Sequence, residues 1–320
     1  MMEADGIVHR MVQANGITMH IAEKGETGAP VVVLLHGFAE LWYSWRHQIL
    51  NLAGRGCRAV APDLRGYGDT SAPPSVASYS LFHIVGDLIA LLDALSIPQA
   101  LLVGNGWGAM VAWQTSLARP DRVKAMVILS MPFMPRNPSV KPVAHFRSIY
   151  GDDYYVCKFQ EPGKMEAEFD RIGTDNVLRS LYSHRDPKTP VMSEEDLPNM
   201  KEMTLPTWLT EDDFSYLVSK FEKSGFTGPL NYYRCLDLNW ELGATWSGMK
   251  IQVPVKFIVG DQDLAYHYKG IQDYIHKGGF KGDVPKLEEV VVMEGVGHFI
   301  NQEKPDEITD HIFEFISQFF

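Results

Sequence analysis

The chain has 320 residues and a formal net charge of −11, with 45% hydrophobic and 22% charged residues. This length allows a large buried core, and the composition is that of an ordinary globular protein. The acidic balance argues against a nucleic-acid partner, because phosphate binding requires a basic face.

No targeting signal and no metal-binding pattern stands out. The N-terminal residues lack a basic and then apolar signal, and no run approaches the roughly 18 apolar residues of a membrane span. Three cysteines, Cys57, Cys157 and Cys235, are scattered without metal-type spacing. We therefore expect a cytoplasmic protein with reduced thiols, no cofactor, no metal and no membrane partner, as a monomer or a homodimer.

Before about residue 130, strand and helix patterns alternate. Residues 8–12 and 17–22 alternate in polarity around Asn15-Gly16, which predicts a hairpin. Apolar runs predict buried strands at Val31–Leu35, Arg58–Pro62, Leu101–Gly104 and Ala125–Leu129. Helical spacing predicts helices at Trp45–Ala53 and Leu81–Leu95. The alternation predicts an α/β fold with a mostly parallel sheet.

The pattern changes after Met131-Pro132. From about 135 to 246 the chain has only proline-broken, aromatic-rich helical pieces, such as 212–223. The alternation resumes with expected elements at 255–259, 271–275, 287–293 and 305–319. We therefore expect one α/β core, residues 1–132 and 247–320, with a helical lid inserted at 133–246.

The segment Leu101–Trp113, LLVGNGWGAMVAW, organises this core. An apolar run ends in a Gly-x-x-x-Gly turn, Gly104 to Gly108, and a helix follows. This is the pattern of a nucleophile elbow, whose middle residue is lifted above a parallel sheet. That position is normally Ser, Cys or Asp, but here it is Gly106, which has no side chain.

Five motifs resemble the plant-type soluble epoxide hydrolases, over nearly the whole chain. They are HGFAELWYSWRHQI (36–49), DLRGYGDTSAP (63–73), VGNGWGAMVAW (103–113), VGDQDL (259–264) and EGVGHFINQEKPDEI (294–308). The lid segments YGDDYYVCKFQEPG (150–163) and FTGPLNYYR (226–234) extend the resemblance. It implies an α/β-hydrolase fold.

The resemblance also implies a set of catalytic residues. In that family an elbow Asp attacks an epoxide carbon to form an ester, and a His oriented by a second Asp activates the water that hydrolyses it. Two lid tyrosines donate hydrogen bonds to the epoxide oxygen. Carried onto this chain, the pair is His298 with Asp263, and the tyrosines are Tyr155 and Tyr233. The oxyanion hole would be the N–H groups of Phe38 and Trp107.

The chain departs from the family pattern at two places. Where the family has Gly-His-Asp-Trp-Gly, it has Asn105 and Gly106 in the second and third positions, and Ala39 replaces the usual Pro. The Ala39 change alters loop stiffness at most. Gly106 removes the ester mechanism, because glycine offers no attacking atom.

Several assignments carry alternatives. Asp261 competes with Asp263, and Tyr154 and Tyr232 compete with their tyrosine neighbours. We interpret His36 as a turn histidine beside the substrate pocket, which would also include Trp107. Asn105 is interpreted as a shape or hydrogen-bonding residue. Three further residues are poor replacements for the missing Asp: Cys157, Cys235 and Glu40. Four lid aromatics predict an apolar, bulky ligand: Trp208, Phe214, Trp240 and Trp246.

Three functions remain open at this point. The first is an enzyme acting on a small apolar epoxide or related electrophile by general acid–base chemistry. It would catalyse direct hydrolysis or intramolecular cyclisation, addition or elimination, with His298 and Asp263 as base and both lid tyrosines as acids. The second is a non-catalytic small-molecule receptor with a hydrolase fold. The third is an inactive epoxide hydrolase, natural or engineered.

Overall fold

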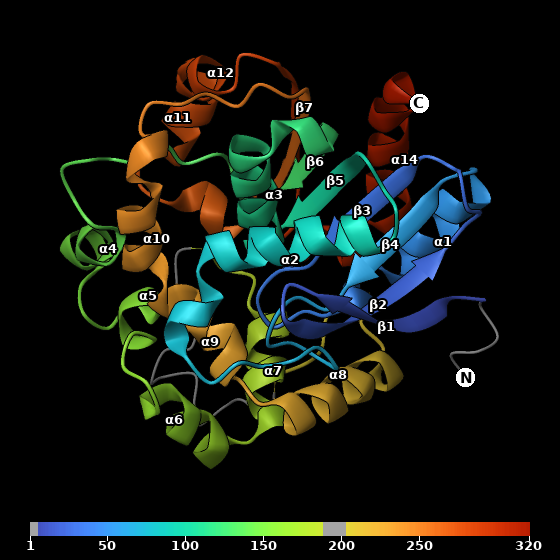
Figure 1. Ribbon diagram of the computed structural model, residues 1–320. Coiled ribbons are helices and arrows are strands. Elements are labelled where there is room, and N and C mark those ends of the chain that lie inside the picture. The colour runs from blue at the N-terminus through green and yellow to red at the C-terminus, as the bar shows by residue number, and fades with distance from the viewer. Residues whose placement is uncertain (1–5, 188–202) are drawn as a thin grey trace.

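A computed structural model describes residues 6–187 and 203–320, and an eight-stranded sheet forms its centre (Figure 1). The strand order is β1-β2-β4-β3-β5-β6-β7-β8. The strands are β1 (Val8–Ala14), β2 (Ile17–Lys24), β3 (Val31–Leu35), β4 (Arg58–Pro62), β5 (Ala100–Asn105), β6 (Val123–Leu129), β7 (Val255–Gly260) and β8 (Leu287–Met293).

The pairing confirms the mostly parallel sheet. β1 pairs with β2, and β2 with β4, in antiparallel orientation, whereas the ladders from β4 through β8 are parallel. The expected hairpin turn has Asn15 at φ 50° and Gly16 at φ 79°, the left-handed conformations that a two-residue hairpin turn requires. All six residues of β5 are buried, because helices cover both faces of the sheet.

Helices pack on both faces of the sheet (Figure 1). On one face, α2 (Leu81–Ala94) and α3 (Trp107–Ala118) pack against each other, and on the other α1 (Arg46–Gly54) packs against α14 (Pro305–Ile316). Three shorter helices complete the core: α11 (Ile271–His276), α12 (Gly279–Asp283) and α13 (Ile300–Glu303). This layering confirms the α/β-hydrolase arrangement expected from the sequence.

The segment between β6 and β7 is helical in its described part. Its helices are α4 (Pro142–Tyr150), α5 (Tyr155–Lys158), α6 (Lys164–Ile172), α7 (Thr174–Ser183), α8 (Glu211–Ser224), α9 (Thr227–Arg234) and α10 (Leu236–Leu242). No strand occurs among the described residues of this insertion. We refer to it as the lid. None of the helices in residues 6–187 and 203–320 is long and apolar enough to span a membrane.

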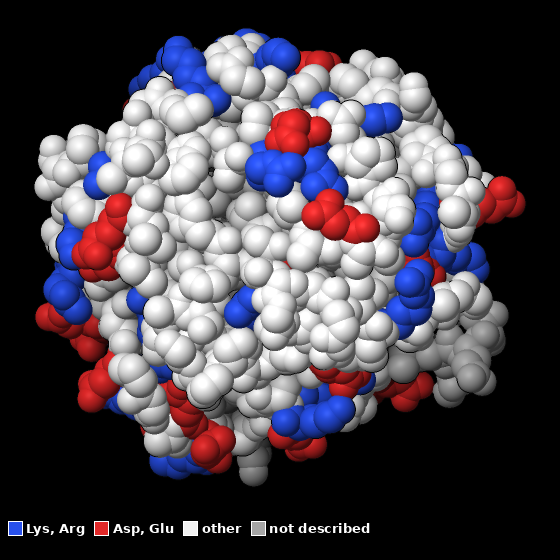
Figure 2. All heavy atoms as spheres, in the orientation of Figure 1, with Lys and Arg blue, Asp and Glu red and all other residues white. Residues whose placement is uncertain are grey.

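Acidic and basic side chains are mixed on the face shown in Figure 2. Lys and Arg lie beside Asp and Glu around its edge, and much of the middle of this face carries neither. A mixed surface of this kind does not concentrate positive potential in the way that phosphate-binding surfaces do.

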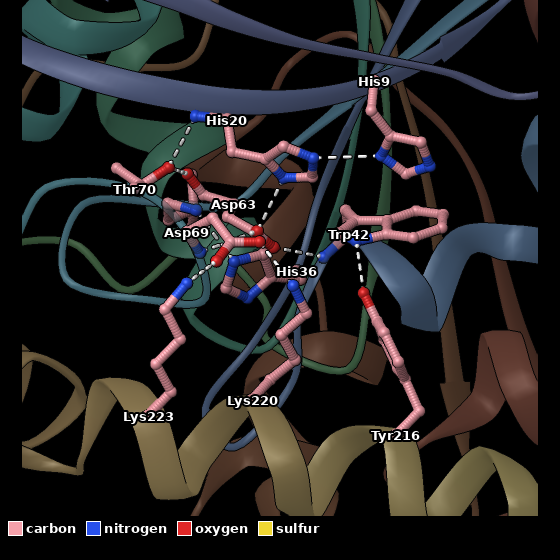
Figure 3. Close-up of polar contacts among 11 residues, drawn as sticks. His9, His20, His36, Trp42, Asp63, Asp69, Thr70, Tyr216, Lys220 and Lys223 are labelled. Carbon is pink, nitrogen blue, oxygen red and sulfur yellow. Dashed lines mark hydrogen bonds and ion pairs between the residues drawn. The ribbon is translucent and has the colours of Figure 1, made fainter. Parts of the chain in front are cut away.

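Lid helix α8 is fastened to the core by polar contacts (Figure 3). Lys220 and Lys223 both form ion pairs with Asp69, and the indole N–H of Trp42 donates to the Tyr216 hydroxyl at 3.1 Å. The two lysines lower the pKa of Asp69 to about 2, against the opposing effect of burial. These contacts hold one side of the lid against the segments that follow β3 and β4.

A chain of three side chains lies beside this junction (Figure 3). His9 on β1 stacks on His20 of β2, with Nδ1 of His9 3.0 Å from Nε2 of His20. Nδ1 of His20 is in turn 2.8 Å from a carboxylate oxygen of Asp63, which follows β4. Because the His9–His20 contact accommodates one hydrogen, protonating both rings would break it.

We predict that this histidine pair makes the protein less stable in mild acid. Burial lowers the pKa of His9, the charge of His20 lowers it further, and Asp63 opposes both. The folded protein therefore binds this proton less readily than the unfolded chain does. The stabilisation is present above the unfolded-state pKa and is lost as the pH falls through the folded-state pKa. His9→Gln should make the loss of melting temperature between pH 7.5 and 5.5 smaller by about 1–2 °C.

The control is His311→Gln on α14, away from this network. Thermal melts of the two variants and the parent protein at several pH values measure the effect. Equal acid sensitivity of His9→Gln and the parent protein would show that the pair does not contribute.

Candidate active site

A cavity of about 410 Å³ lies between the lid and the core. Most of the residues around it are aliphatic or aromatic. Its polar lining groups include His298 of the core, the lid residues Tyr155 and Tyr233, and Tyr268 after β7. Gly106 also lines it, so the cavity reaches the elbow.

The elbow has the geometry that the sequence predicts. Gly106 joins β5 to α3 with φ 54° and ψ −115°, a conformation that strains any residue with a side chain. A Cβ on Gly104 would lie 2.4 Å from the Gly108 carbonyl oxygen, and one on Gly108 would lie 2.0 Å from the Leu35 carbonyl oxygen. The flanking glycines are therefore required by close backbone approach.

Gly106 faces the imidazole of His298. A Cβ built on Gly106 would lie 3.1 Å from Nε2 of His298 and 3.6 Å from Cα of Gly37. A side chain at position 106 would therefore be in direct contact with the His298 ring. With glycine in place, that volume belongs to the cavity.

His298 and Asp263 form a close pair. Nδ1 of His298 lies 3.0 Å from each carboxylate oxygen of Asp263, so the ring donates there and leaves Nε2 facing Gly106. Burial lowers the pKa of His298, but the charge and hydrogen bond of Asp263, together with Glu40, outweigh it, and the pKa lies above its usual value. The histidine side chain is 24% exposed, whereas Asp263 is fully buried. Such a pair can accept a proton at Nε2.

The competing carboxylate, Asp261, has a different hydrogen-bond partner. It accepts a hydrogen bond from the Gly295 N–H at 2.8 Å and does not contact His298. Asp263 also caps the short helix Leu264–His267 by accepting from the Ala265 N–H. The structure therefore places Asp263, and not Asp261, against His298, and the role of Asp263 stays a prediction.

Both tyrosines named from the lid motifs face the cavity. Tyr155 begins α5 and Tyr233 lies near the end of α9, and their ring centroids are 5.8 Å apart. Burial raises the pKa of both phenols well above the usual value, so both are neutral donors. Their neighbours do not line the cavity, and Tyr232 donates instead to the Arg65 carbonyl oxygen at 2.9 Å.

The two backbone groups of the expected oxyanion hole flank the elbow. Trp107 is the first residue of α3, where a backbone N–H has no partner within the helix. Phe38 follows β3, and its ring packs edge-on against Tyr233, as does the Trp107 indole. Both residues line the cavity beside Gly106. That the two N–H groups bind an oxygen remains a prediction.

One pocket residue was predicted wrongly. His36 is fully buried and does not line the cavity. Its Nδ1 lies 2.9 Å from the Gly37 carbonyl oxygen, and its Nε2 accepts from the Leu64 N–H at 2.9 Å. Both ring nitrogens are thus used within the turn, which agrees with the structural part of the interpretation and excludes the pocket role.

Asn105 and Glu40 lie behind the elbow. The amide nitrogen of Asn105 donates to the Glu40 carboxylate at 3.2 Å, and the Gly37 N–H donates to the same oxygen at 2.7 Å. Neither Asn105 nor Glu40 lines the cavity. Asn105 therefore acts as a hydrogen-bonding residue, as interpreted, and Glu40 braces the loop after β3.

For two of the four lid aromatics, the prediction that they face the ligand is also wrong. Trp240 and Trp246 line the cavity, whereas Trp208 and Phe214 do not. Phe214 lies instead on the buried side of α8. An aromatic in the lid packs into the lid's own core as readily as it faces a ligand.

Comparison with known proteins shows the family of this chain. The α/β hydrolase fold family matches residues 30–305. Epoxide hydrolase 1 of Siraitia grosvenorii is 57% identical over 98% of this chain and 99% of its own. The chain belongs to the plant-type epoxide hydrolase family. A crystal structure of a Vigna radiata epoxide hydrolase covers 98% of this chain and 99% of its own, with 57% identity and a TM-score of 0.92. A mutant potato epoxide hydrolase covers 98% and 100%, with 49% identity and a TM-score of 0.93.

The cavity of this epoxide hydrolase family member has an unusual set of polar groups. Among the described residues that line it, none is Asp, Glu, Ser, Thr, Cys or Lys. The lining therefore offers three imidazoles (His145, His184 and His298), three phenols, the Arg136 guanidinium and three side-chain amides, but no carboxylate, thiol, aliphatic hydroxyl or amine that could act as a nucleophile. Within the same described ranges, no group of three or more His, Cys, Asp and Glu side chains could hold a metal ion.

Sequence reasoning missed several polar residues of the cavity, among them Tyr268 and Arg136. Tyr268 lies five residues after Asp263 and hydrogen-bonds to Tyr155 across 113 positions of sequence. Arg136 lies over the Trp240 ring at 4.0 Å and donates to the Trp240 carbonyl oxygen. The aromatic-rich loop after Asp263 was the available signal for Tyr268, but spacing alone does not show which ring faces a cavity.

Proposed function

We propose that this protein is an enzyme that opens a small apolar epoxide, or a related electrophile, without a covalent intermediate. One observation carries the proposal: Nε2 of His298 faces the empty side-chain position of Gly106, in a cavity whose described lining has no carboxylate. The cavity therefore has a catalytic base but no carboxylate that could form an ester. His298 then acts on a hydroxyl group, either of the ligand or of a water molecule.

The reaction then needs two proton movements. His298 takes the proton from water, or from a hydroxyl of the substrate itself, while that oxygen attacks a ring carbon. The carbon–oxygen bond of the ring breaks, and the departing oxygen takes a proton from Tyr155 or Tyr233. Asp263 stabilises the imidazolium, which afterwards returns its proton to the phenolate through solvent. General base and general acid each typically contribute about 10²–10⁴-fold.

The volume left by the missing side chain favours reactions within one substrate molecule. A hydroxyl of the substrate placed beside Gly106 lies next to His298 and needs no separate water. Cyclisation, addition or elimination then competes with direct hydrolysis. The apolar lining, which includes Trp240 and Trp246, supports a substrate with a hydrophobic body.

We expect the attacking oxygen never to come from the protein. Enzyme in excess is mixed in heavy-oxygen water with styrene oxide, and separately with an epoxide that carries a hydroxyl on its own chain. A diol from the first should carry the label in a single turnover, and a cyclic product from the second should have the mass of its substrate. His298→Gln serves as the control and should abolish both products.

Two results would contradict the proposal. Unlabelled diol in the first turnover would show that a protein carboxylate forms an ester. Tight binding of both compounds without any product would favour the receptor function instead.

A further inference from the structure

A third tyrosine connects the base side of the cavity to the lid. Tyr268 follows the short helix Leu264–His267, which Asp263 caps, and its hydroxyl oxygen lies 2.7 Å from that of Tyr155. Both residues line the cavity. The loop that holds the histidine's carboxylate therefore also supports one of the lid phenols.

The ring of Tyr268 is held in place by its surroundings. Phe146 of α4 packs against it edge-on, with ring centroids 5.9 Å apart, and Tyr150 lies 6.4 Å away. The backbone N–H of the next residue, Lys269, donates to the Tyr150 hydroxyl at 2.9 Å. Packing and this backbone contact together fix the direction in which the Tyr268 hydroxyl points.

The direction of the hydrogen bond decides what Tyr155 can do. A phenol carries one hydrogen, and burial raises the pKa of Tyr268 as it does that of Tyr155, so each hydroxyl keeps its hydrogen. If Tyr155 donates to Tyr268, or to the Tyr154 hydroxyl that interacts with both of them, it has no hydrogen left for a ligand. If Tyr268 donates to Tyr155, the Tyr155 hydrogen is free to point at a ligand oxygen.

We propose that Tyr268 is a positioning residue that donates its hydrogen to Tyr155 and so directs the Tyr155 hydrogen at an oxygen acceptor of the ligand. A phenol that accepts a hydrogen bond becomes a stronger donor, because the two bonds polarise each other. Tyr268 thus acts through Tyr155. The inference rests on the donor role of Tyr155 in the proposed function, and it adds a residue that this role depends on.

The test uses two probes of nearly the same shape, benzophenone and diphenylmethane, which differ in the carbonyl oxygen. Affinities are measured by calorimetry for the parent protein, Tyr155→Phe, Tyr268→Phe and the double variant. The parent protein should prefer the ketone. Tyr155→Phe should reduce that preference about 5- to 10-fold and Tyr268→Phe about 3-fold, the scale of single neutral hydrogen bonds. In the Tyr155→Phe background, Tyr268→Phe should have no further effect.

Tyr266→Phe is the matched control. Tyr266 lies on the short helix Leu264–His267 that precedes Tyr268, but its hydroxyl hydrogen-bonds to His276 at 2.8 Å and it does not line the cavity. This variant should leave the preference unchanged.

Each failure has a distinct meaning. If Tyr268→Phe weakened the binding of both probes equally, Tyr268 would have a packing role and the inference would be overturned. It would also be overturned if Tyr268→Phe left the preference for the ketone unchanged, or if it reduced that preference in the Tyr155→Phe background as well. In those cases the donor role of Tyr155 stands if Tyr155→Phe itself reduces the preference. No preference for the ketone in the parent protein would overturn this inference and also the donor role in the proposed function.

Discussion

Gly106→Asp is expected to lower the melting temperature and, at the same time, to create or raise hydrolysis of simple epoxides. At φ 54° and ψ −115° a residue with a side chain is strained by about 1–3 kcal/mol, which glycine avoids. The new Cβ would also come within 3.1 Å of Nε2 of His298, so the ring must move slightly. The carboxylate would then lie beside the base and near the N–H groups of Phe38 and Trp107. We expect diol formation from styrene oxide to rise by about 10²-fold or more, the scale of one catalytic group.

The same substitution should suppress the reaction that the protein performs with glycine. The new carboxylate occupies the volume beside His298 in which water or a substrate hydroxyl would otherwise bind. Product analysis with a hydroxy-epoxide measures this loss. An Asp variant that keeps the original products unchanged would show that the space beside Gly106 is not where the attacking oxygen binds.

A second variant isolates the chemistry of the new carboxylate. Adding His298→Gln to Gly106→Asp removes the base that releases the ester, so intact-protein mass spectrometry should find a covalent adduct with the mass of the epoxide. Combining Asn105→His with Gly106→Asp restores the family's elbow sequence and replaces the amide that donates to Glu40 at 3.2 Å. A well-folded Asn105→His, Gly106→Asp protein with neither adduct nor diol would falsify the idea that His298, Asp263 and the tyrosines are a working set. The receptor function would then be the better explanation.

The fold was predictable because its signals are local. The Asn15-Gly16 turn, the apolar β5 run and the elbow glycines each require one backbone conformation, and each is found where expected. The roles of Asp263 and the two lid tyrosines came from motif positions, and the structure places all three at the cavity or against His298. These residues lie at the ends of strands or helices, where a rigid scaffold commonly positions binding and catalytic residues.

The errors concern residues whose direction depends on distant parts of the chain. His36 precedes Gly37 in a motif loop, but its ring turns toward the Leu64 N–H and away from the cavity. Trp208 and Phe214 were read as ligand-facing aromatics, although composition cannot distinguish a lid's inner packing from its cavity wall. Tyr268 was missed because its partner, Tyr155, lies in another segment. Contacts of this kind are fixed by tertiary packing and leave no periodic pattern.

The second large effect on the reaction rate is expected from removing the hydroxyls of the two lid tyrosines. Tyr155→Phe and Tyr233→Phe each remove one neutral donor aimed at the oxygen that becomes an alkoxide, and each should reduce the rate about 10²–10³-fold. Burial keeps both phenols protonated, so both hydrogens are available in the parent protein. With both removed, the alkoxide would form in an apolar cavity without a phenol donor from the lid pair, and the double variant should be close to inactive. Single-turnover rates with a hydroxy-epoxide measure all three.

Tyr232→Phe separates catalysis from packing. Its hydroxyl donates to the Arg65 carbonyl oxygen, fully buried and outside the cavity lining, so its removal should cost about 1 kcal/mol of stability and leave the rate unchanged. The cavity-facing pair should show the opposite pattern, with large losses of rate and small changes in melting temperature. If Tyr155→Phe and Tyr233→Phe both retain full activity, the two rings are packing residues of the lid. His298 would then have to open the ring without an acid, which a strained epoxide in an apolar cavity does not readily allow.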